Sequence, residues 1–308
     1  MVIGAPHETR MTSGTSQTDV TYLPRHPLRI SVANQKGGVG KTSTVVNVAA
    51  VLAHKFKMDV LVVDLDPQGH ASLALGLERV STEFSISAAL TSYKPVKEII
   101  RETPIDKLHV LPSNEDLAAT EEYISRQPGR EAVVSKLIES LPMRYDFIII
   151  DTPPNLGVLT FNALYASKFV LVPIQPRYFS IDGLRRLYHV IELLHSRLRA
   201  ELEVLGHFLT MVDNRYKITH EIRQDLRHRL GESLLRTEIP SSVRLEEGHF
   251  LGRPCVIYNP DSPVSKAYEA LTVEILERIG SHSRSITAGV GGVEGESKLF
   301  QLGVDKTV

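Results

Sequence analysis

The segment from Leu28 to about Lys55 constrains the fold of this chain more than any other part of the sequence. It begins with the apolar run Leu28–Ala33, passes through the loop Asn34–Lys41 with its three glycines, and continues as a helical pattern from Thr42. Glycines let the backbone turn sharply and bring N–H groups close to an anion, which the positive end of the following helix also attracts. A strand, a glycine- and lysine-rich loop and a helix in this order predict a phosphate loop.

Short apolar runs alternate with amphipathic stretches along the rest of the chain. Strands that are apolar throughout are buried on both faces, and their alternation with helices is typical of α/β folds. We therefore expect a doubly wound, mainly parallel sheet flanked by helices, with ligands at the carboxyl ends of the strands. The expected strands are Leu28–Ala33, Val60–Val63, Leu108–Leu111, Phe147–Ile150, Phe169–Val172 and Val204–Val212. The expected helices are Thr42–Lys55, Arg130–Leu141, Ile181–Leu198, Thr219–Leu230 and Val264–Ile279.

Composition places this folded part between two polar ends. The chain has 308 residues, enough for one large α/β domain, and nothing in its middle resembles a linker. Residues 1–27 and 281–308 are rich in small and polar residues, so we expect a flexible N-terminal arm, a folded domain over 28–280 and a flexible C-terminal tail. The arm lacks the apolar stretch of a signal peptide. No apolar run approaches the roughly 20 residues that cross a bilayer.

Cysteine content and charge exclude several classes of function. The single cysteine, Cys255, excludes a disulfide framework and a multi-cysteine metal site within one chain, and it suits the reducing cytoplasm. We interpret Cys255 as a small core residue in a strand. The formal net charge is -1, so any binding of nucleic acid must come from a local patch.

The predicted phosphate loop carries the groups that hold a nucleotide. Lys41 can reach the β- and γ-phosphates, and the hydroxyl of Thr42 can ligate Mg²⁺. The usual pattern has a glycine where this chain has Gln35, and an extra lysine, Lys36, follows. A glycine-rich turn with surface lysines is the alternative, but strand, loop and helix together favour the phosphate loop. The residues expected at the nucleotide are Lys36, Gly37, Gly38, Val39, Gly40, Lys41, Thr42 and Ser43.

Aspartates follow two further apolar strands. Asp64 and Asp66 come after Val60–Val63, and Asp151 comes after Phe147–Ile150. Carboxylates at the tips of buried strands beside a phosphate loop can support hydrated Mg²⁺ or orient an attacking water. Each alone could equally cap a loop or a helix. Together they predict a site for MgATP, and the expected metal-holding residues are Thr42, Asp64 and Asp151.

These motifs resemble those of the ParA/MinD superfamily of phosphate-loop ATPases. Lys36–Thr42 is similar to the deviant Walker A box of that family, and Asp64–Gly69 and Asp151–Pro154 also fit its pattern. Further along the chain, Leu209–Asp213 and Ile239–Leu245 resemble ParA-type partition ATPases in particular, the Soj/ParA proteins that segregate chromosomes or plasmids.

The resemblance implies a weak ATPase that uses ATP and Mg²⁺ and forms a nucleotide-sandwich homodimer. Lys36 would be the signature lysine that reaches the phosphates of the partner, because a cation supplied in trans stabilises phosphoryl transfer. Catalysis would depend on Lys36, on Lys41 and on Asp66 as the carboxylate that orients water. Gln68–Gly69 and Asn155–Gly157 would sense the γ-phosphate.

The resemblance also implies an adenine site and a DNA surface. Asp213 and Pro240 lie where the family holds the adenine, and ParA-type members bind double-stranded DNA without sequence preference as ATP dimers. The basic face of Thr219–Leu230 alone favours an ordinary solvated helix, because acidic residues are interspersed. Arg244, inside a family motif, favours DNA. The expected DNA-binding residues are Arg215, Arg223, Arg227 and Arg244.

The sequence therefore favours an ATP-dependent DNA-partition ATPase, cytoplasmic and nucleoid-associated, whose hydrolysis a ParB-like centromere-binding protein stimulates. One alternative is a ParA-like ATPase that positions a non-DNA cargo through another adaptor. A second is a MinD-like membrane-associated regulator of the division site, which the glycine-rich tail disfavours because glycine is a poor helix former. No integral membrane association is expected. A nitrogenase iron protein would need two cluster cysteines per subunit, and only Cys255 is present.

Several positions depart from the family pattern. His70 stands where an asparagine is common, Asn155 replaces a serine, and Arg177 stands where an acidic residue is usual. The stretch Glu246–Phe250 replaces a run of small residues. None of these changes removes a phosphate or metal ligand, but Arg177 and Glu246–Phe250 can alter contacts with a partner or with DNA.

Overall fold

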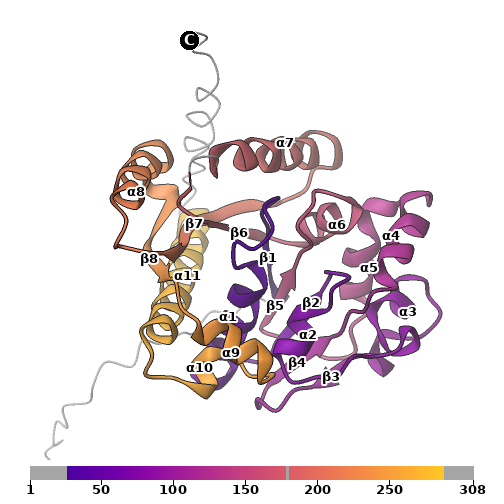
Figure 1. The fold of residues 1–308 in the computed structure, drawn as a ribbon. Coiled ribbons are helices and arrows are strands. Elements are labelled where there is room, and N and C mark those ends of the chain that lie inside the picture. Colours follow the sequence, from indigo (N-terminus) through magenta and orange to yellow (C-terminus); the bar gives the residue numbers. More distant parts are fainter. Residues whose placement is uncertain (1–25, 178–179, 288–308) are drawn as a thin grey trace, which may run out of the picture.

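The strands in the described part of the chain form one eight-stranded sheet, which runs through the middle of the molecule (Figure 1). The computed structural model describes residues 26–177 and 180–287. The strand order is β3-β4-β2-β5-β1-β6-β7-β8, and all pairs are parallel except β3 with β4. The strands are β1 (Leu28–Val32), β2 (Val60–Asp64), β3 (Arg101–Glu102), β4 (Leu108–Leu111), β5 (Phe147–Asp151), β6 (Phe169–Ile174), β7 (Glu203–Val212) and β8 (Leu234–Pro240).

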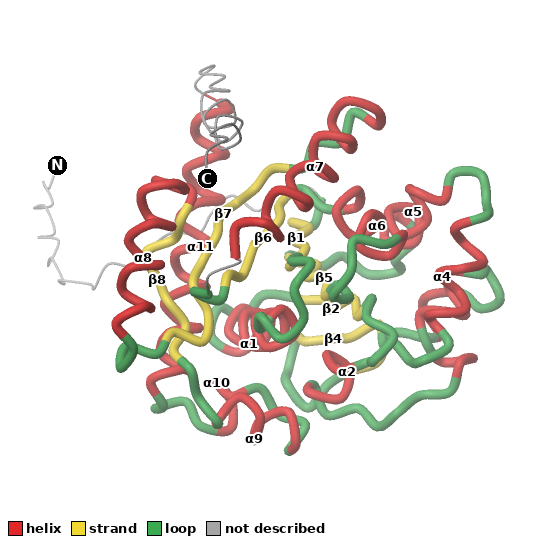
Figure 2. Tube along the Cα trace, turned by 45° about the horizontal axis from the view of Figure 1, so that its top comes forward, coloured by secondary structure: helices red, strands yellow, loops and turns green. Residues whose placement is uncertain are grey.

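Helices connect the strands and cover both faces of the sheet (Figure 2). The α-helices are α1 (Lys41–His54), α2 (His70–Ala74), α3 (Ile86–Leu90), α4 (Leu117–Ser125), α5 (Val133–Glu139), α6 (Val158–Ala166), α7 (Ser180–Leu198), α8 (Lys217–Leu230), α9 (Arg244–Phe250), α10 (Cys255–Tyr258) and α11 (Pro263–Thr287). The 3-10 helices are η1 (Thr82–Phe84), η2 (Val96–Glu98), η3 (Arg130–Ala132) and η4 (Gly231–Ser233). Among the described residues, no helix is long and apolar enough to cross a membrane.

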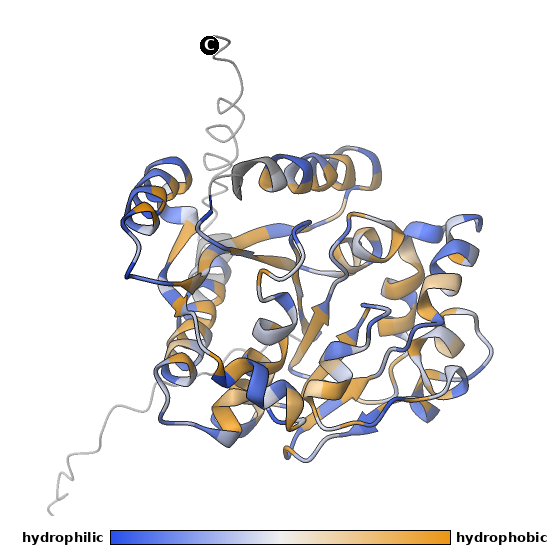
Figure 3. Cartoon of the chain, in the orientation of Figure 1, coloured by the Kyte–Doolittle hydropathy of each residue, from blue (hydrophilic) through white to orange (hydrophobic). Residues whose placement is uncertain are grey.

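Alternation along the central strands explains why both faces need helices. Successive side chains of a strand point to opposite faces. Phe147 and Ile149 of β5 belong to the core that contains α1 and α11, whereas Ile148 and Ile150 belong to the core with α3, α4, α5 and α6. A third cluster packs α7 and α8 against β6 and β7. The hydropathy colouring shows apolar strands between helices whose outer faces are polar (Figure 3).

The six predicted strands and the α/β fold class are confirmed, and the differences lie at polar or short elements. The helix expected over Arg130–Leu141 is divided into η3 and α5, and α11 continues past Ile279 to Thr287. The expectation of a strand at Cys255 is wrong, because this buried residue begins α10. The arm up to residue 25 and the tail from residue 288 lie outside the described residues.

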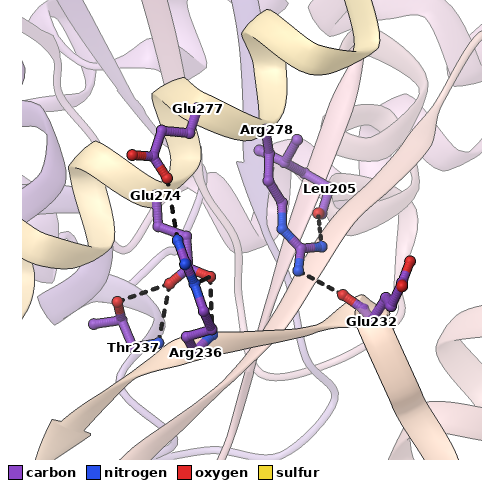
Figure 4. A network of polar contacts seen from close by, with 7 residues as sticks. All are labelled: Leu205, Glu232, Arg236, Thr237, Glu274, Glu277 and Arg278. Atoms are coloured by element: carbon purple, nitrogen blue, oxygen red, sulfur yellow. Dashed lines mark hydrogen bonds and ion pairs between the residues drawn. The ribbon is translucent and has the colours of Figure 1, made fainter. Parts of the chain in front are cut away.

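The strand β8 was not predicted, because polar residues interrupt its apolar pattern. It lies at the edge of the sheet, and α11 packs along it (Figure 4). The carboxylate of Glu274 accepts the N–H groups of Arg236 at 2.9 Å and of Thr237 at 3.0 Å, and the Thr237 hydroxyl at 2.7 Å. Arg278 donates to the carbonyl oxygen of Leu205 at 3.1 Å. The buried carboxylate of Glu274 therefore satisfies N–H groups of the edge strand, and Arg278 joins α11 to the neighbouring strand β7.

Candidate nucleotide-binding site

The phosphate loop leaves β1 and enters α1 through left-handed glycines. Gly38 and Gly40 have φ angles of 67° and 84°, a conformation that favours glycine. Gly40 caps α1, and no side-chain hydrogen bond caps the N-terminus of this helix. The N–H groups of that turn and the positive end of the helix dipole are therefore free to bind an anion.

Neighbouring strands hold the loop in this shape. The amide of Asn34 donates to the carbonyl oxygen of Pro173 at 2.8 Å, and its oxygen accepts the N–H of Lys36 at 3.0 Å. The hydroxyl of Thr210 on β7 donates to the carbonyl oxygen of Val39 at 2.9 Å. Both sides of the loop are thus fixed by the sheet before any nucleotide binds.

The two lysines of the loop lie in different environments. Lys41 is buried, and its Nζ donates to the backbone oxygen of Lys36 at 3.1 Å. Burial lowers the pKa of Lys41, while the carboxylates of Asp151 and Asp66 act in the opposite direction. The side chain of Lys36 is exposed at the surface. Lys41 is therefore positioned for a phosphate within its own site, and Lys36 can reach outward.

Thr42 and Asp151 come together at the base of the loop. The Thr42 hydroxyl donates to Oδ2 of Asp151 at 2.7 Å, and Oδ1 of Asp151 is buried without a hydrogen-bond partner. Burial raises the pKa of Asp151 well above its usual value, and the neighbouring Asp64 adds to this effect. An unsatisfied buried carboxylate oxygen next to a threonine hydroxyl fits the surroundings of a hydrated Mg²⁺.

Asp64 pairs with Asp151 in the sheet register but makes its own contacts elsewhere. Its Oδ2 accepts the N–H of Ser72 at 2.8 Å and the Ser72 hydroxyl at 2.7 Å, and its Oδ1 accepts the N–H of Asp66 at 3.2 Å. Burial raises the pKa of Asp64 to about 6. The structure thus links Asp64 to α2 and to the backbone of Asp66, while Thr42 and Asp151 contact each other directly.

The residues at this site fit MgATP. In the described part of the chain, no three His, Cys, Asp or Glu side chains are arranged to hold a metal ion. Mg²⁺ in phosphate sites usually takes one or two carboxylates together with phosphate oxygens and water. Thr42 and Asp151 would hold the ion, and Lys41 would bind the phosphates. Mg²⁺ supplies charge neutralisation at the transferred phosphate when it is bound.

The residues predicted at the adenine lie at the carboxyl ends of the neighbouring strands β7 and β8. Asp213 directly follows β7, and Pro240 ends β8 opposite Val212. The Asp213 carboxylate accepts two bonds from Nε of Arg215, at 2.9 Å and 3.1 Å. These bonds lower the pKa of Asp213 to about 2. A residue predicted for adenine and a residue predicted for DNA therefore contact each other.

Each arginine predicted to bind DNA forms an ion pair on the surface. Arg223 and Arg227 of α8 share the carboxylate of Glu238, at 2.9 Å and 3.0 Å. Arg244 of α9 pairs with Glu247 at 2.7 Å. Arg215 follows β7, Arg223 and Arg227 lie on α8, and Arg244 begins α9. Their ion pairs involve three different carboxylates, so the four arginines do not form one cluster of contacts.

Two contacts of the site were not predicted from the sequence. Nε2 of His249 lies 3.4 Å from the hydroxyl oxygen of Ser43, and burial followed by repulsion from His70 lowers the pKa of His249. Glu121 accepts the N–H of Leu159 at 3.2 Å, at the start of the helix that follows Asn155–Gly157. The only sequence signal was the departure of His70 and His249 from the family pattern.

Known proteins share both this fold and these motifs. A family model described as an AAA domain matches residues 28–204. The chromosome partitioning protein ParA of Myxococcus xanthus is 38% identical over 249 residues, which are 81% of this chain and 88% of that protein. The sporulation initiation inhibitor protein Soj of Bacillus subtilis is 37% identical over 246 residues, 80% of this chain and 97% of Soj. The cobyrinic acid a,c-diamide synthase of Mycobacterium smegmatis, solved with an ATP analogue and magnesium, superposes with a TM-score of 0.72 and 29% identity, covering 83% of this chain and 97% of that one.

Fold and site together define a phosphate-loop ATPase with a lysine at the start of the loop, the deviant Walker A class. Within that class, the chain belongs to the family of ParA-type ATPases, as its identity to ParA and Soj over most of their length shows.

Proposed function

We propose that this chain is a DNA-partition ATPase whose MgATP-bound form is a sandwich dimer on nonspecific DNA. Binding of ATP brings two copies together, and Lys36 of each copy reaches the phosphates of the other. Slow hydrolysis, stimulated by a ParB-like partner, separates them. The partitioning role named for the M. xanthus relative supports this proposal.

The observation that carries the proposal is the contrast between the two lysines of the loop. Lys41 is buried and bonded to the backbone of its own loop, so it serves its own nucleotide. Lys36 is exposed beside it and can neutralise a phosphate that belongs to a second copy. A cation that completes the site only in the dimer couples dimerisation to hydrolysis.

In this proposal, Asp66 orients the attacking water, Asp64 and Asp151 support Mg²⁺ together with Thr42, and Asp213 and Pro240 hold the adenine. Arg215, Arg223, Arg227 and Arg244 bind DNA phosphates. DNA binding in the ATP state would make the protein nucleoid-associated in the cytoplasm.

The test is binding of a fluorescent nonspecific duplex by the Asp66→Ala variant, which should trap the ATP state. We expect tight binding with MgATP, weak binding with MgADP, and a steep loss of affinity as salt rises. Dimerisation without DNA binding would contradict a DNA-partition role and would favour another surface as the cargo site. Lys36→Ala should bind ATP as a monomer and fail in both dimerisation and DNA binding.

A further inference from the structure

Backbone atoms of the turn after α9 lie close to backbone atoms of the turn after α2. Gly76 and Gly252 lie in these turns and have left-handed φ angles of 89° and 62°. A Cβ atom on Gly252 would lie 3.0 Å from Cα of Gly76, and a Cβ atom on Gly76 would lie 3.1 Å from the carbonyl oxygen of Gly252. This contact therefore depends on two glycines, which leave neither turn room to move independently.

A second set of contacts joins the same segment to α1, the helix of the phosphate loop. His249 lies 3.4 Å from the hydroxyl oxygen of Ser43, the residue after Thr42. In α10, the N–H of Val256 donates to the side-chain oxygen of Asn47 at 3.1 Å, and the amide of Asn47 donates to the backbone of Ser43 at 2.8 Å. The segment from α9 to α10 thus contacts both the turn after α2 and α1, the helix that follows the phosphate loop.

We expect the start of α2 to change position when the bound nucleotide changes. This helix begins directly after Gln68–Gly69, and Ser72 within it bonds the buried Asp64. Arg244 begins α9, and its ion pair with Glu247 lies within the same short helix, so the guanidinium group moves with α9 as a unit. The surface around it is open, because Val243, Phe250 and Leu251 are 67%, 91% and 54% exposed.

We propose that the Gly76–Gly252 and Ser43–His249 contacts transmit the nucleotide state from α2 and α1 to α9, which makes Gly252 and His249 positioning residues for the DNA contact of Arg244. This inference rests on the proposed function, since Arg244 binds DNA only there. Tightly packed contacts of this kind move as units rather than deform, so a displacement of α2 is passed to α9. The Ser43–His249 contact keeps α9 aligned with the loop that holds the phosphates.

The test uses hydrogen exchange of the backbone amides of residues 244–250 in the Asp66→Ala protein, with MgATP and with MgADP. We expect the nucleotide to change exchange in α9, and Gly252→Ala to remove most of that change while leaving nucleotide affinity unaltered. Gly129→Ala is the matched control, because Gly129 is also left-handed (φ 71°) but its added Cβ would lie 3.8 Å from Nζ of Lys136, which is ordinary van der Waals contact. An α9 response in Gly252→Ala equal to that of the control would overturn the inference.

The second readout is the ratio of DNA affinities in the ATP and ADP states. Couplings of this kind typically amount to about 5–150-fold, and we expect Gly252→Ala and His249→Leu to lower the ratio toward one. His249→Gln should recover it, because its amide can occupy the place of Nε2. The His249 variants add no Cβ and keep the test valid if Gly252→Ala folds poorly; an unchanged ratio in His249→Leu contradicts the inference. An α9 response to ATP without DNA binding would contradict the proposed function and leave the coupling in place.

Discussion

The carboxyl ends of β1, β2 and β5 differ sharply from the surface formed by α8 and α9. In the first region, Lys41, Asp64 and Asp151 are buried, and burial shifts their pKa values. In the second region, Arg215, Arg227 and Arg244 are exposed and Arg223 is partly buried, and each is paired with a nearby carboxylate. Buried charges interact strongly, whereas exposed pairs contribute little and exchange partners easily. The first region is therefore suited to fixed chemistry, and the second to reversible contact with a polyanion.

The largest effect should come from the buried region. Lys41→Ala removes the cation that binds the phosphates, and we expect ATPase activity to fall by on the order of 10²–10³-fold, as for loss of one electrostatic donor to a transition state. Phosphate release under saturating MgATP measures this loss. The matched control is Lys266→Ala, which removes an exposed lysine paired with Asp261 and should leave the rate unchanged. Equal rates in both variants would remove Lys41 from the catalytic site.

The buried side chain of His207 predicts that the stability of the protein depends on pH. His207 of β7 bonds Ser233 at 2.7 Å and Tyr188 at 3.1 Å, and burial lowers its pKa from 6.5 to about 4. Between pH 6.5 and pH 4, His207 takes up a proton more readily in the unfolded chain than in the folded chain. The stability associated with neutral, buried His207 is therefore complete above pH 6.5 and is lost as the pH falls toward 4. We expect a loss of roughly 3 kcal/mol.

Urea unfolding at pH 7 and at pH 4 measures this contribution. The relevant quantity is the pH dependence of the native chain minus that of His207→Gln, because other groups titrate in the same range. An identical pH dependence in both proteins would mean that folding does not change the pKa of His207.

Arg244→Ala should have a smaller effect, confined to DNA binding. Loss of one phosphate contact weakens binding to all sequences alike and lowers the slope of log affinity against log salt by about 1. Anisotropy titrations with nonspecific duplex at several salt concentrations measure that slope. Arg126→Ala is the control, because Arg126 is also exposed and paired with a nearby glutamate, but directly after α4. A slope unchanged from the control would place the DNA surface elsewhere.

The smallest effect tests the two ion pairs of Glu238. Glu238→Gln removes the partly buried carboxylate shared by Arg223 and Arg227. Ion pairs at a protein surface contribute about 0.2–1 kcal/mol, so we expect DNA affinity to rise by at most roughly fivefold. Glu122→Gln, which removes the partner of Arg126, is the control. Weaker DNA binding after Glu238→Gln would show that the pair positions the arginines rather than competes with DNA.

The same contrast explains what the sequence could and could not predict. The phosphate loop and the aspartates at strand ends depend on local order, so their motifs sufficed to predict them. The bonds of Asp64 to Ser72 depend on how a loop returns to the sheet, and the contact of Ser43 with His249 joins positions far apart in the chain. Strand β8 escaped prediction because Arg236, Thr237 and Glu238 break its apolar pattern at the edge of the sheet.

The hydroxyl of Thr210 that supports the carbonyl oxygen of Val39 has a consequence for synthesis of the chain. Translation proceeds from the N-terminus, so the whole glycine-rich motif leaves the ribosome long before β7, the strand that holds it in shape. A nascent chain that already carries every phosphate-binding residue therefore gains a finished nucleotide site only after β7 joins the sheet.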